Sequence, residues 1–181
     1  MGFLQGIDER LFYYINGTLA NSVTDKVMPF ITNGENWVIF FVIMWFYVFV
    51  KGGPKGRALA ILVILCFILS DQTSNLIKEL VGRVRPCASL PNVHLLINCG
   101  SGKSFPSSHA VNNFAGAVLI SHFYPKLKYL VYAGAFLIAI SRIFVGVHYP
   151  IDVLGGMIIG IILGLFVIFL YELINKKFKF T

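Results

Sequence analysis

Residues 151–174 read IDVLGGMIIGIILGLFVIFLYELI, a stretch of 24 residues in which only Asp152 and Glu172 carry charge. A transmembrane helix needs about 20 predominantly apolar residues, so this stretch is long enough to cross a bilayer. Four further stretches share this character: residues 57–81, 107–124, 127–144 and the shorter but intensely apolar 36–50. The sequence therefore predicts an all-α, polytopic membrane helix bundle.

The composition of the whole chain favours the same class. Of its 181 residues, 57% are hydrophobic and only 13% are charged, whereas soluble domains are about 45–50% apolar and about 25% charged. A bilayer would cover the apolar surface that one globular core of this size leaves exposed. The length suits a single domain over residues 1–181, with an N-terminal segment (1–35), a helix bundle (36–174) and an outer loop (82–106) inside it.

The N-terminal segment has a weaker apolar pattern than the spans. Between residues 3 and 33, apolar side chains recur at helical spacing with polar ones between them: Ile7, Leu11, Phe12, Ile15 and Leu19 alternate with Asp8, Glu9, Arg10 and Asn16. This pattern is typical of an amphipathic helix that lies in the membrane interface. A sixth span is the alternative, so we expect five to six transmembrane helices.

The cations are distributed as expected for the two sides of a membrane protein. They do not form the single patch that a nucleic-acid partner would require. Eight of the fifteen occupy two connections and the C-terminal tail: Lys51, Lys55, Arg57, Lys126, Lys128, Lys176, Lys177 and Lys179. With five spans these regions share one side, and the positive-inside rule makes that side, with the C-terminus, cytoplasmic. Five of the other seven lie in or beside the outer loop. Cations kept there against the rule predict an anion site that faces the periplasm or the cell exterior.

Two of the three cysteines, Cys87 and Cys99, lie in this loop with eleven residues between them. In an oxidising compartment they could form a disulfide, although sequence alone does not fix the geometry. The chain has no CxxC pair and no Cys/His spacing typical of a metal site.

The loop begins within the stretch KELVGRVRP, residues 78–86, at the end of the second span. Lys78 and Arg85 are seven residues apart, and two helical turns would project them from one face of a helix. Interfacial cations that extend toward the headgroups are the alternative interpretation. Glu79 and Arg83, four residues apart, are expected to form an ordinary exposed pair.

The loop ends with SFPSSHA, residues 104–110, at the start of the third span. Ser107 or Ser108 is a natural N-cap, and the free N–H groups of a helix N-terminus suit a phosphate oxygen. His109 then lies in the first turn, beside that anion. A routine capped helix with an interfacial histidine would explain the same residues.

The connection between the fourth and fifth spans reads SRIFVGVHYPID, residues 141–152. Arg142 ends one span, His148 occupies the turn, and Asp152 follows four residues later. The Asp152 carboxylate could accept a hydrogen bond from one ring nitrogen of His148 and leave the other free as a nucleophile. The alternative is an ordinary acidic residue in a first helical turn, but ionisable groups between such apolar helices are functional candidates.

Together the three stretches resemble the signature of the type 2 phosphatidic acid phosphatase superfamily. The matching residues are Lys78-x6-Arg85-Pro86, then Pro106-Ser107-Ser108-His109, then Ser141-Arg142-x5-His148-x3-Asp152. The resemblance covers residues 78–152 by motif and the remainder by helix layout. Ser108 stands where the family usually has glycine, and its Cβ is expected to narrow the phosphate pocket.

The resemblance implies that His148 attacks phosphorus, that Asp152 orients it, and that His109 protonates the leaving oxygen and then activates water. It implies no metal and no other cofactor. It assigns the phosphoryl oxygens to Lys78, Arg85, Ser107, Ser108 and Arg142.

Small bacterial members of this superfamily act on undecaprenyl pyrophosphate, the 1-phosphate of lipid A, phosphatidylglycerol phosphate or phosphatidic acid. We therefore expect a lipid phosphatase of the bacterial inner membrane, with the first two lipids favoured. A transporter or channel with an anion-binding outer vestibule is the alternative, although it would need neither a nucleophilic histidine nor its aspartate. The oligomeric state cannot be predicted, because lipid-facing and partner-facing apolar surfaces look alike.

Overall fold

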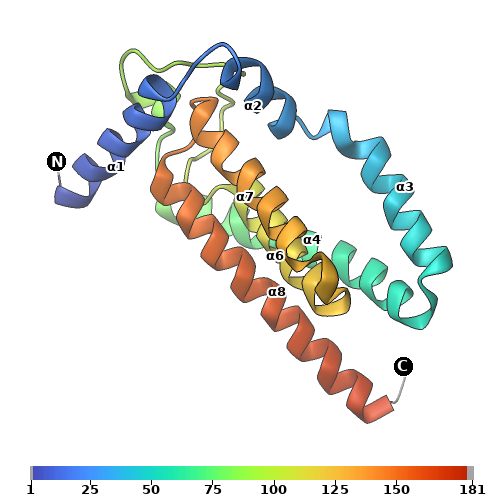
Figure 1. Ribbon diagram of the computed structural model, residues 1–181. Coiled ribbons are helices and arrows are strands. Elements are labelled where there is room, and N and C mark those ends of the chain that lie inside the picture. The colour runs from blue at the N-terminus through green and yellow to red at the C-terminus, as the bar shows by residue number, and fades with distance from the viewer. Residues whose placement is uncertain (1, 179–181) are drawn as a thin grey trace.

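The computed structural model describes residues 2–178, which are helical and contain no strand. The predicted all-α class is confirmed. The elements in chain order (Figure 1) are α1 (Phe3–Tyr13), the π-helical turn η1 (Tyr14–Thr18), α2 (Thr24–Thr32), α3 (Glu35–Lys51), α4 (Gly53–Val81), α5 (Pro86–Ser89), α6 (Ser108–Phe123), the 3₁₀ turn η2 (Pro125–Leu127), α7 (Lys128–Phe144) and α8 (Pro150–Phe178).

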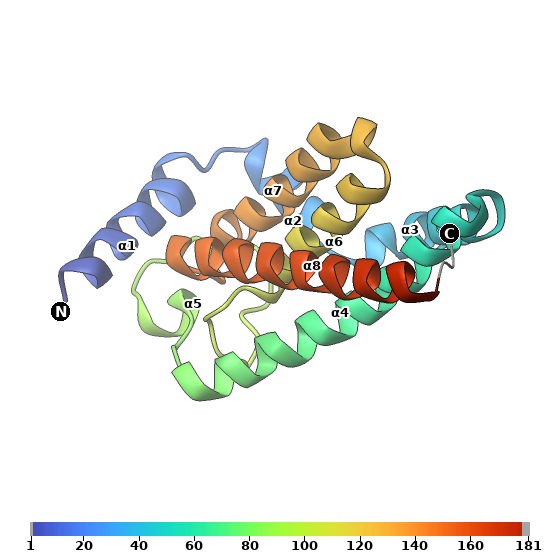
Figure 2. The ribbon, with the colours of Figure 1, turned by 90° about the horizontal axis from the view of Figure 1, so that it is seen from below.

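Helix α6 lies at the centre of the bundle, with α4, α7 and α8 packed around it (Figure 2). Half of its 16 residues are buried: Ala110, Val111, Phe114, Ala115, Ala117, Val118, Leu119 and Phe123. Helix α3 packs on α4 and has no buried residue, while α2 packs on α7. The outer helices therefore leave their apolar side chains to the bilayer, and α6 is shielded from it.

Fewer helices than the sequence predicted are long and apolar enough to span a membrane. Within residues 2–178 there are three such segments, namely Gly53–Ser89, Pro125–Phe144 and Pro150–Lys177. Helices α2 and α3 make a fourth if counted together, because they are bent by 48° at a short break. Helix α6 is too short at 16 residues, since a span needs about 20. Its neighbours enclose it, so it has less need of that length.

The N-terminal segment forms two helices rather than the single amphipathic helix predicted over residues 3–33. On the first, Asp8, Phe12 and the following Asn16 form a stripe that is at most 1% exposed. Leu4 and Leu11 are 70% and 47% exposed. The polar residues of this stripe therefore face the bundle rather than lipid headgroups, and the apolar face of α1 is the one left for a membrane interface.

A row of glycines on α8 brings this helix close to α6. Gly156, Gly160 and Gly164 follow one another at four-residue spacing. A Cβ atom at Gly160 would lie 2.3 Å from the carbonyl oxygen of Val111. Small residues at this spacing allow two helix backbones to approach closely. The contact sets the N-terminal turn of α6 against that of α8.

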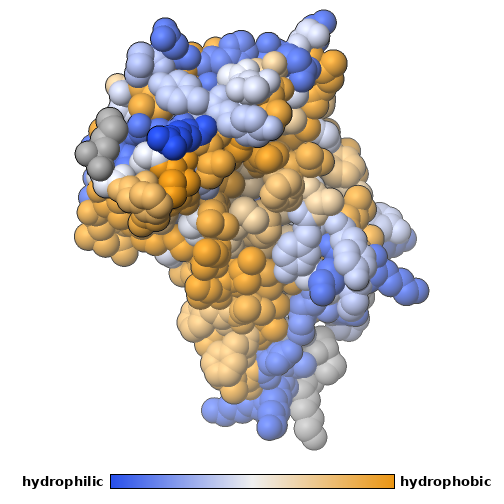
Figure 3. All heavy atoms as spheres, turned by 60° about the vertical axis from the view of Figure 1, so that its left-hand side comes forward, coloured by the Kyte–Doolittle hydropathy of each residue, from blue (hydrophilic) through white to orange (hydrophobic). Residues whose placement is uncertain are grey.

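The surface has an apolar belt between two polar ends (Figure 3). The first, here called the basic end, joins the α3–α4 turn, the α6–α7 turn and the last turns of α8. Lys55 Nζ lies 5.4 Å from the Tyr124 ring centroid, and His122 lies 3.6 Å from Glu172. Seven of the eight cations predicted to share one side belong to these segments, and Lys179 lies outside the described residues. The other, here called the loop end, carries α1, α5 and residues 82–107 (Figure 2).

Candidate active site

Backbone hydrogen bonds join the three sequence stretches at the loop end. The N–H of Ser104 donates to the carbonyl of Arg83 over 2.7 Å, and the N–H of Ser107 donates to the carbonyl of Asp152 over 3.0 Å. The first bond ties the two ends of the loop together. The second fixes the start of α6 against the start of α8. Residues that are distant in the sequence thus share one site.

His148 lies in the turn between α7 and α8 and is 2% exposed. Its Nδ1 atom lies 3.5 Å from Oδ2 of Asp152. Burial lowers the pKa of this imidazole to about 4, and although the Asp152 carboxylate opposes this shift, the Arg142 and Arg85 charges add to it. His148 is therefore neutral at pH 7 and has the lone pair that a nucleophile needs.

The Asp152 carboxylate is fully buried and hydrogen-bonded on both oxygens. Oδ2 accepts from the backbone N–H of Tyr149 over 2.8 Å and from the Ser104 hydroxyl. Oδ1 accepts from Arg83 Nη1 over 2.7 Å. These bonds offset the cost of burying the charge, and they fix which oxygen faces His148.

The first turn of α6 presents groups that suit an anion. Ser107 is the N-cap, and its hydroxyl is buried without a hydrogen-bond partner. Lys78 Nζ donates to the hydroxyl of Ser108, the residue that replaces the usual glycine. An ammonium group, a free hydroxyl and a helix N-terminus can together hold phosphate oxygens.

Arg142 and His109 share a partner, Thr32, at the end of α2. Arg142 Nη1 donates to Thr32 Oγ1 over 2.7 Å, and the His109 ring hydrogen-bonds the Thr32 backbone. Arg142 is 8% exposed, and its Nε has no hydrogen-bond partner among residues 2–178. That donor is available to an anion. No sequence pattern marks Thr32, because the contact exists only once α2 has packed on α7.

Arg85 does not project from α4, as its two-turn spacing from Lys78 had indicated. The helix ends at Val81, and Gly82 adopts a left-handed conformation with φ 64° while its N–H donates to the Lys78 carbonyl. This is a common helix ending. Arg85 then lies in extended backbone, where its Nε donates to the carbonyl of Gly102 over 2.9 Å. The loop, rather than a helix face, brings its charge to His148.

Arg83 is not the exposed partner of Glu79 that the sequence indicated. Its Nη2 lies 2.5 Å from Oδ2 of Asp8 and its Nη1 lies 2.7 Å from Oδ1 of Asp152. Its guanidinium lies 4.0 Å from the centroid of the Tyr149 ring. Helical spacing does not apply to Glu79 and Arg83, because α4 ends between them.

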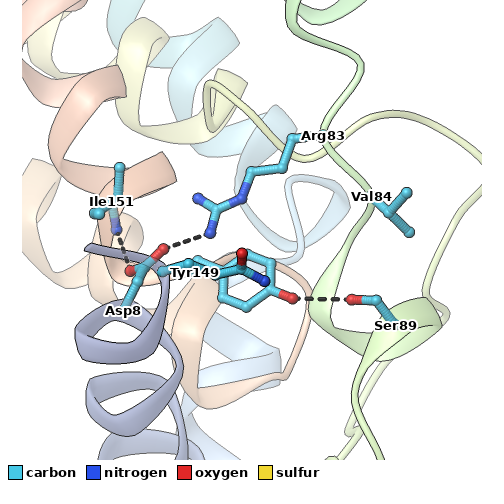
Figure 4. A pocket seen from close by; sticks show the side chains of 7 residues that line it. Asp8, Arg83, Val84, Ser89, Tyr149 and Ile151 are labelled. Carbon is cyan, nitrogen blue, oxygen red and sulfur yellow. Dashed lines mark hydrogen bonds and ion pairs between the residues drawn. The ribbon is translucent and has the colours of Figure 1, made fainter. Parts of the chain in front are cut away.

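A cavity of about 410 Å³ opens beside Arg83 (Figure 4). Its lining residues are Gln5, Asp8, Arg83, Val84, Ser89, Tyr149 and Ile151. The Tyr149 and Ser89 hydroxyls are 2.9 Å apart across it, and the Ile151 N–H donates to Asp8 (Figure 4). Arg83 belongs both to this cavity and to the Asp152 environment, so it connects the two.

The loop itself is held in place by two devices. Cys87 and Cys99 form a disulfide, with 6.0 Å between their Cα atoms, so the pairing that the sequence left open exists in the structure. The Asn16 side chain accepts the His94 N–H over 2.9 Å and donates to the His94 carbonyl over 2.8 Å. It also donates to the Phe144 carbonyl at the end of α7.

The structure thus gathers at the loop end every residue predicted for the site: Lys78, Arg85, Ser107, Ser108, His109, Arg142, His148 and Asp152. Four further residues in the same network were missed, namely Asp8, Arg83, Ser104 and Thr32. Asp8 carried no distinct signal, since the helical pattern placed it with the other polar residues that lie between the apolar ones.

Residues 58–176 match the family model of the PAP2 superfamily. The chain is 30% identical to the lipid A 4'-phosphatase of Bacteroides thetaiotaomicron over 87% of this chain and 74% of that protein. It is also 30% identical to the undecaprenyl-diphosphatase BcrC of Bacillus subtilis over 86% and 79% of the two chains. The bacitracin transport permease protein BcrC of Bacillus licheniformis is 37% identical, and there the match covers 62% of this chain and 56% of the relative.

Two crystal structures share the fold. The transmembrane PAP2 type phosphatidylglycerolphosphate phosphatase of Bacillus subtilis has a TM-score of 0.73 at 27% identity, over 95% of this chain and 88% of that one. Aquifex aeolicus LpxE has a TM-score of 0.70 at 28% identity, over 90% and 94%. These relatives bear out the enzyme class that the three motifs predicted. With a family model that matches well over half its length, the chain belongs to the PAP2 superfamily.

Proposed function

We propose that the protein removes phosphate from a phosphorylated lipid through a phosphohistidine formed on His148. The observation that supports this most directly is the setting of His148, which is buried and lies 3.5 Å from Asp152, with the charges of Arg142 and Arg85 acting on it. Phosphoryl transfer requires mainly an aligned nucleophile and fixed positive charge around the phosphoryl oxygens. The loop end supplies both.

In the first step, the Nε2 atom of His148, the ring nitrogen that does not face Asp152, attacks phosphorus while the bond from phosphorus to the lipid oxygen breaks. His109 gives a proton to the departing oxygen. Burial and the Arg142 charge lower the pKa of this imidazole in the free protein, and the negative charge of the bound phosphate raises it again, so that His109 carries this proton in the lipid complex. The imidazole gains positive charge as its bond to phosphorus forms, and the Asp152 carboxylate stabilises that charge.

In the second step, water attacks the phosphorus of the phosphohistidine, and the phosphorus–nitrogen bond breaks. His109, now neutral, takes a proton from the water. Inorganic phosphate leaves, and His148 is neutral again. The oxygens are held in both steps by the same groups: Lys78, Arg85, Ser107, Ser108 and Arg142.

The proposed substrates are a lipid A phosphate and undecaprenyl diphosphate, since two relatives at 30% identity are named for phosphatases of these lipids. Phosphatidylglycerol phosphate and phosphatidic acid come second. The test is to measure the release of inorganic phosphate from each of the four lipids, with and without EDTA. The rates rank the lipids as substrates. We expect release to continue in EDTA, because the cations of the side chains replace a metal.

The decisive variant is His148→Ala in the detergent-solubilised protein. We expect phosphate release to fall by about 10⁴-fold or more, as for other lost nucleophiles. The matched control is His122→Ala, because His122 lies at the basic end, 3.6 Å from Glu172, and its loss is expected to leave the rate unchanged. Undiminished release by His148→Ala would refute the mechanism. A wild type that releases no phosphate from any lipid of the panel would instead favour a transporter, the class for which the Bacillus licheniformis relative is named.

We place the loop end at the outer face of the inner membrane, with the C-terminus cytoplasmic, because the basic end collects the cations that the positive-inside rule assigns to the cytoplasm. Exposed positions for a test are Lys103 in the loop and Lys126 in the α6–α7 turn. A membrane-impermeant maleimide applied to intact cells should label Lys103→Cys but not Lys126→Cys. The reverse pattern would invert the topology. The wild type is the background control, because Cys66 is buried and the other two cysteines are paired.

A further inference from the structure

Two buried carboxylates at the loop end depend on one guanidinium. Asp8 on α1 and Asp152 on α8 are each 0% exposed, and Arg83 bonds both of them, at 2.5 Å and 2.7 Å. A buried carboxylate without a cationic or hydrogen-bonding partner tends to take up a proton instead of remaining charged. The three side chains therefore form one ion-paired chain, Asp8–Arg83–Asp152.

This chain is fixed at the Asp8 end as well. Oδ1 of Asp8 accepts the backbone N–H of Ile151, the residue before Asp152, over 2.9 Å. The guanidinium of Arg83 lies over the Tyr149 ring, whose hydroxyl contacts Ser89 (Figure 4). Asp8 thus holds the guanidinium and the first turn of α8 together, and the stacked ring limits where the guanidinium can move.

The orientation of the Asp152 carboxylate depends on this arrangement. Its Oδ2 atom is shared by the Tyr149 N–H, the Ser104 hydroxyl and, at 3.5 Å, His148 Nδ1. Its Oδ1 atom has Arg83 as its partner. A carboxylate anchored through both oxygens cannot rotate about its Cβ–Cγ bond, so the bond from Arg83 to Oδ1, together with the Tyr149 and Ser104 bonds to Oδ2, fixes the direction in which Oδ2 points.

We propose that Asp8 and Arg83 are positioning residues for the nucleophile: through Asp152 they hold His148 in its reactive orientation, and α1 is thereby part of the catalytic unit. This inference rests on the proposed function of His148. Since the pair acts on the nucleophile rather than on phosphate, its loss should lower kcat and leave KM nearly unchanged.

The test uses the full-length protein in detergent with the best lipid of the panel. Arg83→Gln should lower kcat by about 10- to 100-fold, a range typical of residues that hydrogen-bond and orient a functional side chain without touching the substrate. Arg83→Lys should fall between this variant and the wild type, because an ammonium keeps the charge but lacks the fork that bonds two carboxylates. The matched controls are Arg10→Gln and Glu9→Gln on α1, the helix that carries Asp8. Both should keep the wild-type kcat.

Two further readouts distinguish positioning from a general loss of folded protein. Without Arg83, Asp152 keeps the hydrogen bonds from Tyr149 and Ser104 that stabilise its charge but loses the neighbouring cation. More negative charge then remains beside His148, so the acid limb of kcat/KM should move to higher pH. A lower fraction of folded protein would scale the rate without moving that limb. Inhibition by inorganic phosphate should stay at the wild-type level. The double variant Asp8→Asn with Arg83→Gln should lose no more than Arg83→Gln alone, as expected for residues that act as a unit.

An Arg83→Gln variant with unchanged kcat and an unmoved acid limb would overturn the inference. If His148→Ala is inactive at the same time, only the positioning role is wrong. If His148→Ala also retains activity, the proposed function itself is wrong. Should Arg83→Gln not accumulate, Asp8→Asn and Arg83→Lys decide, and full kcat in both would overturn the inference equally.

Discussion

The Nδ1 atom of His148 and the Oδ2 atom of Asp152 are 3.5 Å apart, and this oxygen already accepts hydrogen bonds from the Tyr149 N–H and the Ser104 hydroxyl. A distance of 3.5 Å is at the outer limit of a hydrogen bond. As the imidazole becomes positive during attack, its attraction to the carboxylate grows. The pair is therefore built to interact more strongly in the transition state than in the resting protein.

Replacement of Asp152 by asparagine should remove this gain while keeping the shape of the side chain. We expect kcat to fall by about 10³- to 10⁴-fold, as in hydrolases whose histidine loses its aspartate. The rate of phosphate release under saturating lipid measures the effect. The control is Asp25→Asn, since Asp25 pairs with His94, a residue outside the proposed catalytic set. A loss of less than tenfold in Asp152→Asn would show that the carboxylate is structural.

The buried position of His148 predicts that phosphohistidine formation continues at unusually low pH. With its pKa lowered to about 4, the neutral nucleophile persists well below the pH at which an exposed histidine becomes protonated. The rate of phosphohistidine formation in single-turnover measurements should therefore hold down to about pH 5 and fall below about pH 4. A decline centred near pH 6.5 would mean that His148 is solvated in the working protein.

Thr32 should matter although it lies outside the three motifs. Thr32→Val keeps the shape but removes the hydroxyl that accepts from Arg142. Loss of an acceptor for a buried charged donor should lower kcat/KM by about tenfold or more. Thr18→Val is the control, because Thr18 is exposed. Equal kcat/KM in the two variants would show that Arg142 does not need this bond.

The glycine row of α8 makes a prediction about stability. Gly160→Ala places a Cβ atom against the Val111 backbone and should lower the free energy of unfolding by about 1–3 kcal/mol, with Gly160→Leu worse. Gly134→Ala on α7 is the control, since a Cβ there meets nothing within 4 Å. Thermal unfolding in detergent, followed by tryptophan fluorescence, compares them. Equal midpoints would contradict the close approach.

The bundle and the motif residues could be predicted from the sequence because both depend on local patterns. Apolar length marks α4, α7 and α8, and fixed spacing marks His148 with Asp152. The errors arose where a helix ends. The seven-residue spacing of Lys78 and Arg85 predicted one helix over residues 78–85, but the left-handed Gly82 ends the helix before Arg83. Arg85 therefore lies in the loop, and Arg83 bonds Asp8.

Contacts between segments distant in the sequence could not be predicted in this way. Asp8 meets Arg83 and Thr32 meets Arg142 only because α1 and α2 dock on the loop end. No periodicity within either segment specifies a partner so far along the chain. Likewise, the spacing of Cys87 and Cys99 permitted a disulfide without requiring one. The folded loop brings the two residues close enough for the disulfide to form.

The glycine row that joins α6 to α8 has a consequence for how such an enzyme can change its substrate. Because these backbones touch, the helix that carries His109 and the helix that carries Asp152 cannot slide apart to admit a bulkier lipid. Room for a different headgroup or tail must therefore come from the edge of the bundle, where α3 has no buried residue. The site that holds phosphorus can then stay unchanged while the surface that meets the rest of the lipid varies.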